Sequence, residues 1–592
     1  MAIVNHGRAT DRAELTDQWG TIKRLSRYLL HERKKMIGIG LLILGSTIGS
    51  VGGPLLIGFA IDDWIVNQQT GTIWPLLVGL VSLFIGQSVT LWIQQFLMID
   101  VAQNAIFRLR TELFHALQQL PIPFYDKRRH GELMSRVTND VDQISNTLNS
   151  AVIQIVSSVL TLGTITALMI WLSPTLTVIT LMIIPLMFLS IKWITKRTGP
   201  SFKETQKAVG DLNGYIEETV SGQKLVKAFS QEERVLAEFE EKSSRLKKAA
   251  YRAQLFSGAI PKVMNLLNNG SFALIAGVGG YLALTGTQVT VGVIVIFVEY
   301  ARQFTRPLND LANQFNTLLS AIAGAERVFA IMDEPKEASK DGAKDVDLTR
   351  GKVEFKDISF GYEEGERTIK DISFTANPGD TVAFVGPTGA GKTTVTNLLG
   401  RFYEPQEGQI FIDDIPLDKM TLHSTRQAMA FVLQDPFLFE GTIRENIRYG
   451  RLQASDEEVI EAAKLANAHR FIKKLPRGYD TVLSQDDSGI SQGQRQLLSI
   501  ARAFIAKPTI LILDEATSSI DTITEIYIQE ALKRLMVGRT SFVIAHRLNT
   551  IRQADQIIVL KDGEMIESGT HTELVRRRGF YADLVEKQTA IS

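Results

Sequence analysis

Long apolar stretches divide the chain into two parts of different character. Before about Ser320, runs of mostly apolar residues recur, whereas the remainder mixes polar and apolar positions as a globular domain does. A membrane-spanning helix needs roughly 20 mostly apolar residues. The last of the runs is the most polar, since Glu299, Arg302 and Arg306 interrupt it. The pattern predicts six spans, near residues 36–61, 73–99, 152–172, 174–196, 259–286 and 289–318.

Basic residues gather at one end of these spans. The connections 62–73, 173–174 and 285–290 contain neither Lys nor Arg. The opposite ends are basic, with Lys23, Arg24, Arg27, Arg33, Lys34, Lys35, Arg108, Arg110, Lys127, Arg128, Arg129, Lys192, Lys196 and Arg197. Loops rich in Lys and Arg stay in the cytoplasm. We therefore expect both termini, and the globular part, to be cytoplasmic.

The connections after the second and fourth predicted spans are long and have an amphipathic helical pattern. We expect these helices to run well beyond the bilayer before they turn back. Pro121, Pro123 and Gly131 mark the first turn, and the segments 211–214 and Gly222 mark the second. The two tips would touch a soluble domain below the membrane.

A phosphate-binding loop follows an apolar strand in the polar part of the chain. Residues 386–393 read GPTGAGKT and fit G-x-x-x-x-G-K-[ST] at every fixed position. In this motif backbone N–H groups wrap the phosphates, Lys392 reaches the β- and γ-phosphates, and the Thr393 hydroxyl holds Mg²⁺. The candidate nucleotide-binding residues here are Gly386, Pro387, Thr388, Gly389, Ala390, Gly391, Lys392, Thr393 and Thr394.

A second apolar strand ends in two acids. Residues 509–515 read TILILDE, and a buried parallel strand delivers such charges to the sheet edge where nucleotides bind. Asp514 would hold Mg²⁺ through water, and Glu515 would polarise the attacking water. The two motifs together predict an ATPase.

This half resembles the nucleotide-binding domain of the ATP-binding cassette (ABC) superfamily, and the whole chain resembles a multidrug-type half-transporter exporter. The resemblance implies that Tyr362, in FGYEEGERTIK, stacks on adenine. It implies that Gln434, in FVLQDPFLF, contacts Mg²⁺ and the cytoplasmic tips. It also makes Asp521, in SSID, the D-loop acid, and His546, in VIAHRLNT, a contact of the γ-phosphate. Glu515, His546 and Gln434 are thus the catalytic candidates, with ATP and Mg²⁺ as cofactors.

The resemblance also implies a domain order. We expect a cytoplasmic segment with an elbow helix over 1–35, a six-helix transmembrane domain over 36–322, a linker over 323–350 and the nucleotide-binding domain over 351–592. The fold class is then an all-α membrane domain followed by an α/β P-loop ATPase domain. The expected location is a bacterial inner or plasma membrane, crossed several times.

The segment that matches the family's LSGGQ signature reads ISQGQ. In the family this segment caps ATP bound to a second chain, so the resemblance implies a dimer. The signature residues are Ser491, Gln492, Gly493 and Gln494. Residues 484–487 read SQDD, where homodimeric relatives usually have a stretch like Gly-Glu-Arg-Gly.

The intact Walker residues beside an altered signature resemble one subunit of a heterodimeric bacterial exporter. We expect this chain to supply the catalytic Glu to a partner whose own Glu is degenerate. A homodimer with a tolerated variant signature is the alternative.

Polar side chains within the spans are candidate substrate contacts. They are Gln87, Gln94, Gln95, Asn265, Asn268, Asn269 and Glu299. An ionisable group at membrane depth is a functional candidate, so Glu299 is expected to face the cavity and favour amphipathic cations. The alternative is that Glu299 pairs with Arg302 or Arg306 along its own helix.

Composition narrows the class of protein. The absence of cysteine excludes disulfides and thiolate chemistry. The balance of 64 basic against 64 acidic residues argues against a general nucleic-acid binder. ATP-driven export of hydrophobic or amphipathic drugs is the leading expectation, with a lipid or lipid-linked flippase as the alternative. Six spans argue against a non-transport ATPase module.

Overall fold

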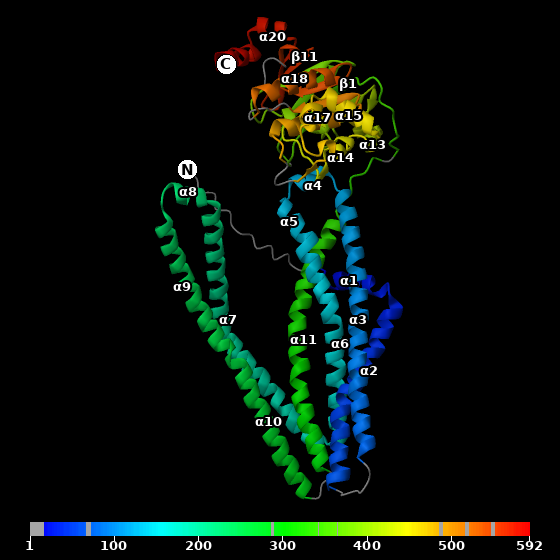
Figure 1. The fold of residues 1–592 in the computed structure, drawn as a ribbon, viewed down its shortest axis with the longest axis vertical. Coiled ribbons are helices and arrows are strands. Elements are labelled where there is room, and N and C mark those ends of the chain that lie inside the picture. The colour runs from blue at the N-terminus through cyan, green and yellow to red at the C-terminus, as the bar shows by residue number, and fades with distance from the viewer. Residues whose placement is uncertain are drawn as a thin grey trace. The chain divides into compact units, whose positions relative to one another are not determined.

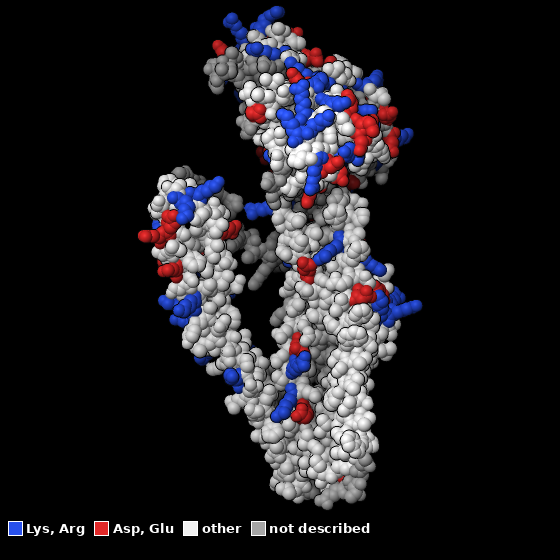
Figure 2. All heavy atoms as spheres, in the orientation of Figure 1, with Lys and Arg blue, Asp and Glu red and all other residues white. Residues whose placement is uncertain are grey.

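The computed structural model describes residues 17–66, 73–285, 289–340, 342–363, 365–484, 489–514, 520–545 and 551–591. Two compact units divide the chain. The helical unit takes residues up to Gln118 and from His130 to Glu334, and the α/β unit takes Gln119–Arg129 and everything from Pro335 onward. On the face drawn in Figure 2, charged side chains are dense over the α/β unit and only scattered over the helical unit.

Long helices make up the helical unit (Figure 1). In chain order they are α1 (Gln18–Leu30), α2 (Arg33–Ala60), α3 (Trp74–Gln118), α5 (His130–Ser135), α6 (Val141–Leu172), α7 (Pro174–Ser221), α8 (Gln223–Ala228), α9 (Glu232–Ser257), α10 (Ala259–Leu284) and α11 (Val291–Met332), with π-helical turns η1 (Ile61–Val66) and η2 (Arg136–Asp140). Helices α2, α3, α6 and α11 pack together, while α7 packs along α9 and α10. The last helix extends to Met332, through the first part of the segment 323–350 assigned to a linker.

Five helices of the described residues are long and apolar enough to cross a membrane: they include α2, α3, α6, α7 and α11. Helix α10, at the fifth predicted span, has 26 residues but is not among the five. Its Asn265, Asn268 and Asn269 interrupt the apolar run within the first half of the helix.

Of the two positions predicted for the second turn, Gly222 is confirmed and 211–214 is wrong. Residues 211–214 lie inside α7, which is continuous to Ser221, and the chain reverses through Gly222 and α8. Helix-weakening residues cost only about 1 kcal/mol each in a helix interior. Packing of α7 against α9 offsets that cost.

Close packing of α2 on α3 depends on small residues. A Cβ on Gly49 would lie 2.9 Å from Cβ of Gln87, and one on Gly53 would lie 3.0 Å from Phe84. Helix α11 is held to α2 by the buried Tyr300, whose hydroxyl donates to the Val51 carbonyl at 2.8 Å.

The α/β unit is built on a six-stranded sheet of order β12-β11-β3-β10-β9-β6, beside a four-stranded sheet of order β2-β1-β4-β5. The strands are β1 (Val353–Phe360), β2 (Ile369–Ala376), β3 (Thr381–Val385), β4 (Glu407–Ile412), β5 (Ile415–Pro416), β6 (Met429–Val432), β7 (Gly441–Thr442), β8 (Val482–Leu483), β9 (Ile510–Asp514), β10 (Thr540–Ile544), β11 (Gln556–Lys561) and β12 (Glu564–Gly569). The helices are α4 (Ile122–Asp126), α12 (Lys392–Leu399), α13 (Leu422–Gln427), α14 (Ile443–Arg448), α15 (Asp456–Leu465), α16 (His469–Ile472), α17 (Gln492–Ala506), α18 (Thr522–Met536), α20 (His571–Arg577) and α21 (Phe580–Ile591), with 3₁₀ turns at Leu417–Lys419 and Gly478–Asp480.

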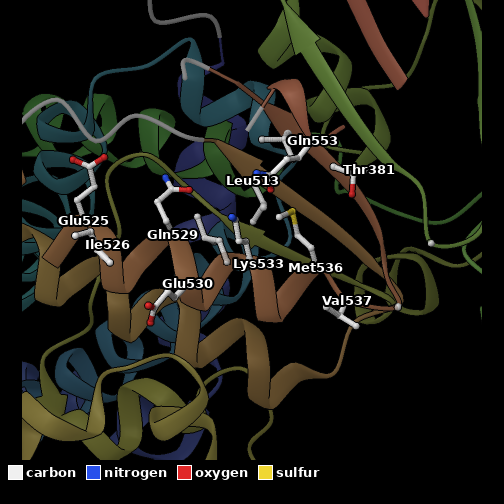
Figure 3. Close-up of a pocket in the computed structure, with 14 residues that line it drawn as sticks. Thr381, Leu513, Glu525, Ile526, Gln529, Glu530, Lys533, Met536, Val537 and Gln553 are labelled. Carbon is white, nitrogen blue, oxygen red and sulfur yellow. The ribbon is translucent and has the colours of Figure 1, made fainter. Parts of the chain in front are cut away.

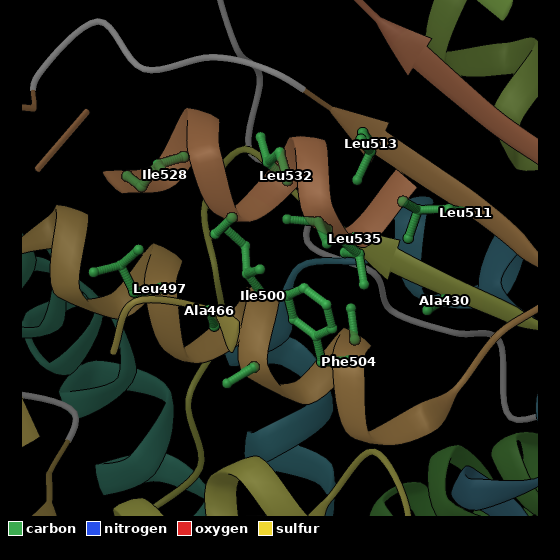
Figure 4. Close-up of a cluster of buried hydrophobic side chains, with 14 of the residues drawn as sticks. Ala430, Ala466, Leu497, Ile500, Phe504, Leu511, Leu513, Ile528, Leu532 and Leu535 are labelled. Atoms are coloured by element: carbon green, nitrogen blue, oxygen red, sulfur yellow. The ribbon is translucent and has the colours of Figure 1, made fainter. Parts of the chain in front are cut away.

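Alternation along the central strands builds two cores. Successive side chains of a strand point to opposite faces. Leu511 and Leu513 of β9 pack with α17 and α18 (Figure 4), whereas Ile510 and Ile512 pack with α12 and the antiparallel sheet. Helices α12 and α17 therefore cover opposite faces of the six-stranded sheet. This arrangement confirms the predicted fold class of a helical membrane part followed by an α/β P-loop domain.

Candidate functional site

The phosphate-binding loop joins the end of β3 to the start of α12. Gly391, the residue before the helix, has a φ of 98°, and a Cβ there would lie 2.5 Å from Cδ1 of Ile369. At Gly386 a Cβ would lie 2.1 Å from the Leu560 carbonyl oxygen. Only glycine fits these two positions, so the backbone can follow the tight turn that presents N–H groups to phosphates.

Lys392 opens α12 and lies inside this loop. Its side chain donates to the carbonyl oxygens of Gly386 at 2.8 Å and Pro387 at 2.9 Å. The residue is only 8 % exposed. Burial lowers the pKa of the Lys392 ammonium, while the nearby carboxylate of Asp514 opposes the shift. A largely desolvated ammonium that meets two carbonyl oxygens is stabilised further by an anion such as a phosphate.

Oxygen donors for a hard cation come from three elements. The Thr393 side chain is exposed in the first turn of α12, Asp514 ends β9, and Gln434 is exposed after β6. Hydroxyl, carboxylate and amide oxygens are the donors that Mg²⁺ accepts, and Mg²⁺ is commonly bound through one or two carboxylates with substrate phosphates. The donor set therefore fits Mg²⁺. Glu515 and His546 lie outside the described residues.

Tyr362 lies against the first turns of α12. Its hydroxyl donates to Thr394 Oγ1 at 3.2 Å and accepts from Asn397 Nδ2 at 3.3 Å. The ring meets Phe360 edge-on, with centroids 5.0 Å apart. The residue is 37 % exposed, so part of its ring remains available for stacking on a base.

A second tyrosine, which sequence reasoning missed, joins this cluster. Tyr403 meets the Tyr362 ring edge-on, with centroids 4.9 Å apart. Its hydroxyl donates to Asp126 Oδ2 of α4 at 2.6 Å. Helix α4 is the predicted first tip and belongs to the α/β unit. Tyr403 thus contacts both the tip and the aromatic neighbour of the P-loop helix. No local motif marks it.

The C-terminal end of α12 is connected to the same tip by a chain of hydrogen bonds. The Gln119 carbonyl accepts from the Glu337 backbone N–H at 2.7 Å, and Glu337 takes two hydrogen bonds from Arg426, at 2.9 and 2.6 Å. Arg426 in turn donates to the Arg401 carbonyl at 2.9 Å, just after α12 ends. The tip segment is therefore linked to both ends of the P-loop helix.

The signature segment starts α17 with a capping box. Ser491 Oγ accepts from the Gln494 backbone N–H at 3.3 Å, and Gln494 Oε1 accepts from the Ser491 backbone N–H at 3.0 Å. Gln492 is the first residue of the helix. The free N–H groups of a helix start favour an anion. Residues 485–488 lie outside the described residues.

Gly493 has a packing role in addition to any contact with phosphate. A Cβ there would lie 2.5 Å from Cγ2 of Thr524 and 3.0 Å from Cγ2 of Ile520. Asp521 caps α18, because its carboxylate accepts from the Thr524 backbone N–H at 2.9 Å, and this bond lowers the pKa of Asp521. Thr524 therefore lies against Gly493 of the signature helix and donates its backbone N–H to Asp521, the predicted D-loop acid.

The predicted substrate contacts separate into two groups. Glu299 pairs with Arg302 at 3.4 Å along α11, which was the alternative expected from the sequence. Glu299, Asn265, Asn268 and Asn269 do not line the polar cavity of the helical unit, whereas Gln87, Gln94 and Gln95 do. The cavity has a volume of about 590 Å³.

A further hollow, of about 600 Å³, lies between α18 and the sheet (Figure 3). Leu513 and Met536 contribute apolar walls, and Glu525, Gln529 and Lys533 contribute polar ones. None of the P-loop residues 386–393 lines it, so this hollow is not the nucleotide site.

Comparison with known proteins matches this geometry. Residues 36–308 match the family described as ABC transporter transmembrane region, and residues 369–518 match the family described as ABC transporter. The chain is 59 % identical over 582 residues to an "Uncharacterized ABC transporter ATP-binding protein YfiC" of Bacillus subtilis (strain 168), covering 98 % of this chain and 96 % of that one. It is 40 % identical over 608 residues to a "Fatty acid ABC transporter ATP-binding/permease protein" of Mycobacterium bovis, covering 95 % and 96 %. A solved structure of a bacterial Atm1-family ABC exporter with ATP bound matches with a TM-score of 0.75 and 29 % identity, over 94 % of this chain and 98 % of that one.

Proposed function

The chain belongs to the ABC transporter family, as a membrane region fused to an ATPase domain, and on this premise we propose that it is one half of a dimeric exporter of hydrophobic or amphipathic compounds. ABC exporters work as dimers in the lipid bilayer, and this chain has the ATPase-coupled transport domain of an exporter. The observation that carries the proposal is the P-loop, in which a buried Lys392 lies in a glycine-bounded turn at the end of β3.

In this proposal each residue of the ATP site has a separate task. Lys392 exchanges its carbonyl partners for the β- and γ-phosphates, and Tyr362 stacks on adenine. Thr393, Asp514 and Gln434 would hold Mg²⁺, which would supply positive charge beside the phosphates when bound. Glu515 orients the attacking water, and His546 contacts the γ-phosphate. Positioning and electrostatics supply most of the catalysis in phosphoryl transfer.

A second chain completes the site. Helix α17, with the signature, and helix α12, with the P-loop, cover opposite faces of one sheet. This separation supports the view that Ser491, Gly493 and Gln494 cap ATP held by a partner. Because the signature and the segment 484–487 depart from the common pattern, we propose that the partner is a different ABC chain with a degenerate catalytic Glu.

The expected orientation follows the basic residues. Both termini and the ATPase domain would lie in the cytoplasm of a bacterium, below its plasma membrane. ATP binding would close the two ATPase domains on each other, and the tips near 121–131 and at 222–228 would transmit that motion to the spans. Hydrolysis and product release would then reset the transporter.

The alternative substrate class is a lipid. The Mycobacterium bovis relative is described as a fatty acid transporter, which favours keeping a lipid or lipid-linked flippase as the second candidate. Purified protein in proteoliposomes, energised with external ATP, distinguishes the two. Accumulation of an amphipathic dye supports the drug exporter, whereas movement of fluorescent lipid between leaflets without dye transport supports the flippase. ATP-dependent movement of neither class contradicts both.

A further inference from the structure

The polar cavity of the helical unit has an unusual wall for a membrane protein. It lies between α2, α3, α6 and α11, all within one unit. Twelve of its seventeen lining residues are neutral and hydrogen-bonding, and only Leu91, Ile153 and Pro307 are apolar. The neutral polar residues are Ser46, Thr47, Ser50, Gln87, Gln94, Gln95, Ser150, Gln154, Ser157, Ser158, Thr161 and Gln303.

These side chains lie at membrane depth. Helices α2 and α6 end at Ala60 and Leu172, and helices α3 and α11 begin at Trp74 and Val291, all on one side of the helical unit. The lining residues lie 10 to 22 positions along their helices from these four ends. At 1.5 Å per residue this is roughly 15–33 Å, against a hydrocarbon thickness of about 30 Å. Polar groups at this depth cost free energy unless a polar partner meets them.

Some of the hydrogen-bonding capacity is used within the protein. Ser46 Oγ donates to the Ile43 carbonyl at 3.0 Å, and Gln154 Oε1 accepts from Gln314 at 2.7 Å. Among the described residues, the buried Gln303 Oε1 has no hydrogen-bond partner. A primary amide offers one acceptor and two donors, so the five glutamines of the wall can satisfy both kinds of group on a ligand.

Fixed charge is balanced at this wall. Arg306 and Asp310 are the only charged lining residues, and they lie 3.9 Å apart at the closest nitrogen–oxygen approach. With one Arg and one Asp, the wall therefore has no net charge with which to select a charged head group. A head group with several hydroxyl or amide groups and no net charge would find matching donors and acceptors on α2, α3, α6 and α11.

We propose that this cavity is a substrate site for amphiphiles with an uncharged, hydroxyl-rich head, such as a sugar. The proposal rests on the exporter function above and narrows its substrate class. Gln87, Gln95 and Gln303, which are not fully buried, grip the head, and the one Arg and one Asp of the wall leave it without net charge.

The test uses the dimer in lipid nanodiscs. Because this chain has no cysteine, Ser157→Cys gives it one thiol, in the wall, and the partner chain is used with any cysteines of its own replaced by serine. The rate of its reaction with a small polar maleimide is measured with three ligands of the same tail, each below its micelle concentration: dodecyl maltoside, dodecyltrimethylammonium and dodecyl sulfate. We expect dodecyl maltoside to slow the reaction at least threefold and the two charged ligands to have little effect.

Added substitutions show whether the amides cause the protection. In a variant with Gln95→Leu and Gln303→Leu, half-maximal protection should need about tenfold more maltoside, the change expected when hydrogen bonds of about 1.4 kcal/mol in total are lost. Gln103→Leu changes an exposed position of α3, the helix of Gln95, outside the cavity. It should leave the maltoside concentration for half-maximal protection unchanged. ATPase activity is measured on every variant to show that the dimer is folded.

Three results would overturn the proposal. These are equal protection by all three heads, preference for a charged head, and a thiol that does not react even without ligand because the assembled dimer fills the cavity. Each can occur while ATP-driven transport persists, in which case the exporter function stands and only the substrate class fails. Loss of all ATP-dependent transport by the unsubstituted dimer would instead refute the proposed function.

Discussion

Substitution of Gly493 by alanine tests whether the signature glycine is needed for packing. The added methyl group would lie 2.5 Å from Cγ2 of Thr524, about 1 Å inside the usual separation of two carbon atoms. It would also lie 3.0 Å from Cγ2 of Ile520. Helices α17 and α18, which bury Leu497, Ile500 and Leu535 between them and the sheet (Figure 4), would have to move apart.

The expected loss of stability follows from two opposing terms. Overpacking of a well-packed contact costs about 1–3 kcal/mol. Alanine recovers up to about 1 kcal/mol through its higher helix propensity. The net loss is then roughly 1–2 kcal/mol, which corresponds to a fall in Tm of about 5 °C for a domain of this size.

The assay combines thermal unfolding with ATPase activity of the full-length dimer. Thr524→Ser removes the methyl group that Gly493→Ala would strike, so the double variant should recover most of the lost Tm. If the glycine also allows the signature backbone to approach a partner's γ-phosphate, ATPase activity should stay low in the double variant although Tm has recovered. Thr524→Ser alone provides the baseline.

Two results would refute the packing argument. The first is a Gly493→Ala variant whose Tm equals that of the unsubstituted protein. The second is a Tm loss that Thr524→Ser does not reduce, because the clash would then not lie between these two residues.

Further predictions concern the tip, the D-loop and span six. Tyr403→Phe keeps the ring packing against Tyr362 but removes the hydrogen bond to Asp126, so substrate-stimulated ATPase should fall severalfold while basal activity stays within about twofold, and an equal fall of both would argue against a coupling role. Asp521 has a lowered pKa in the folded protein, so its capping stabilises the fold above the ordinary Asp pKa and is lost as pH falls through about 4 and below. The Tm difference between the wild type and Asp521→Ala should therefore shrink with acidification, and a constant difference would contradict this account. Glu299→Gln should leave ATP-dependent substrate transport undiminished, since Glu299 already pairs with Arg302; a loss of transport would restore Glu299 as a substrate contact.

Local motifs made the strands, turn and helix around the expected ATP site predictable. The P-loop and the β9 strand with Asp514 were placed correctly because glycine spacing and apolar runs specify a turn and a buried strand over a few residues. The capping box at Ser491 and Gln494 is equally local. Such signals need no knowledge of what packs from elsewhere in the chain.

Long-range packing accounts for what the sequence missed. Tyr403 and Asp126 are 277 positions apart, and neither belongs to a motif, so only the folded chain reveals their hydrogen bond. Residues 211–214 have weak helix propensity, yet α7 continues through them because it packs on α9. The steric role of Gly493 likewise depends on Thr524, which a signature pattern cannot show.

The most direct test of the account is the ATPase activity of this chain purified alone, compared with a Glu515→Gln variant and with the chain co-expressed with candidate ABC partners. The account predicts almost no activity from the lone chain, recovery with one partner, and loss again when that complex carries Glu515→Gln. Robust Glu515-dependent activity from the lone chain would contradict the heterodimer and show that two copies of this chain complete each other's sites.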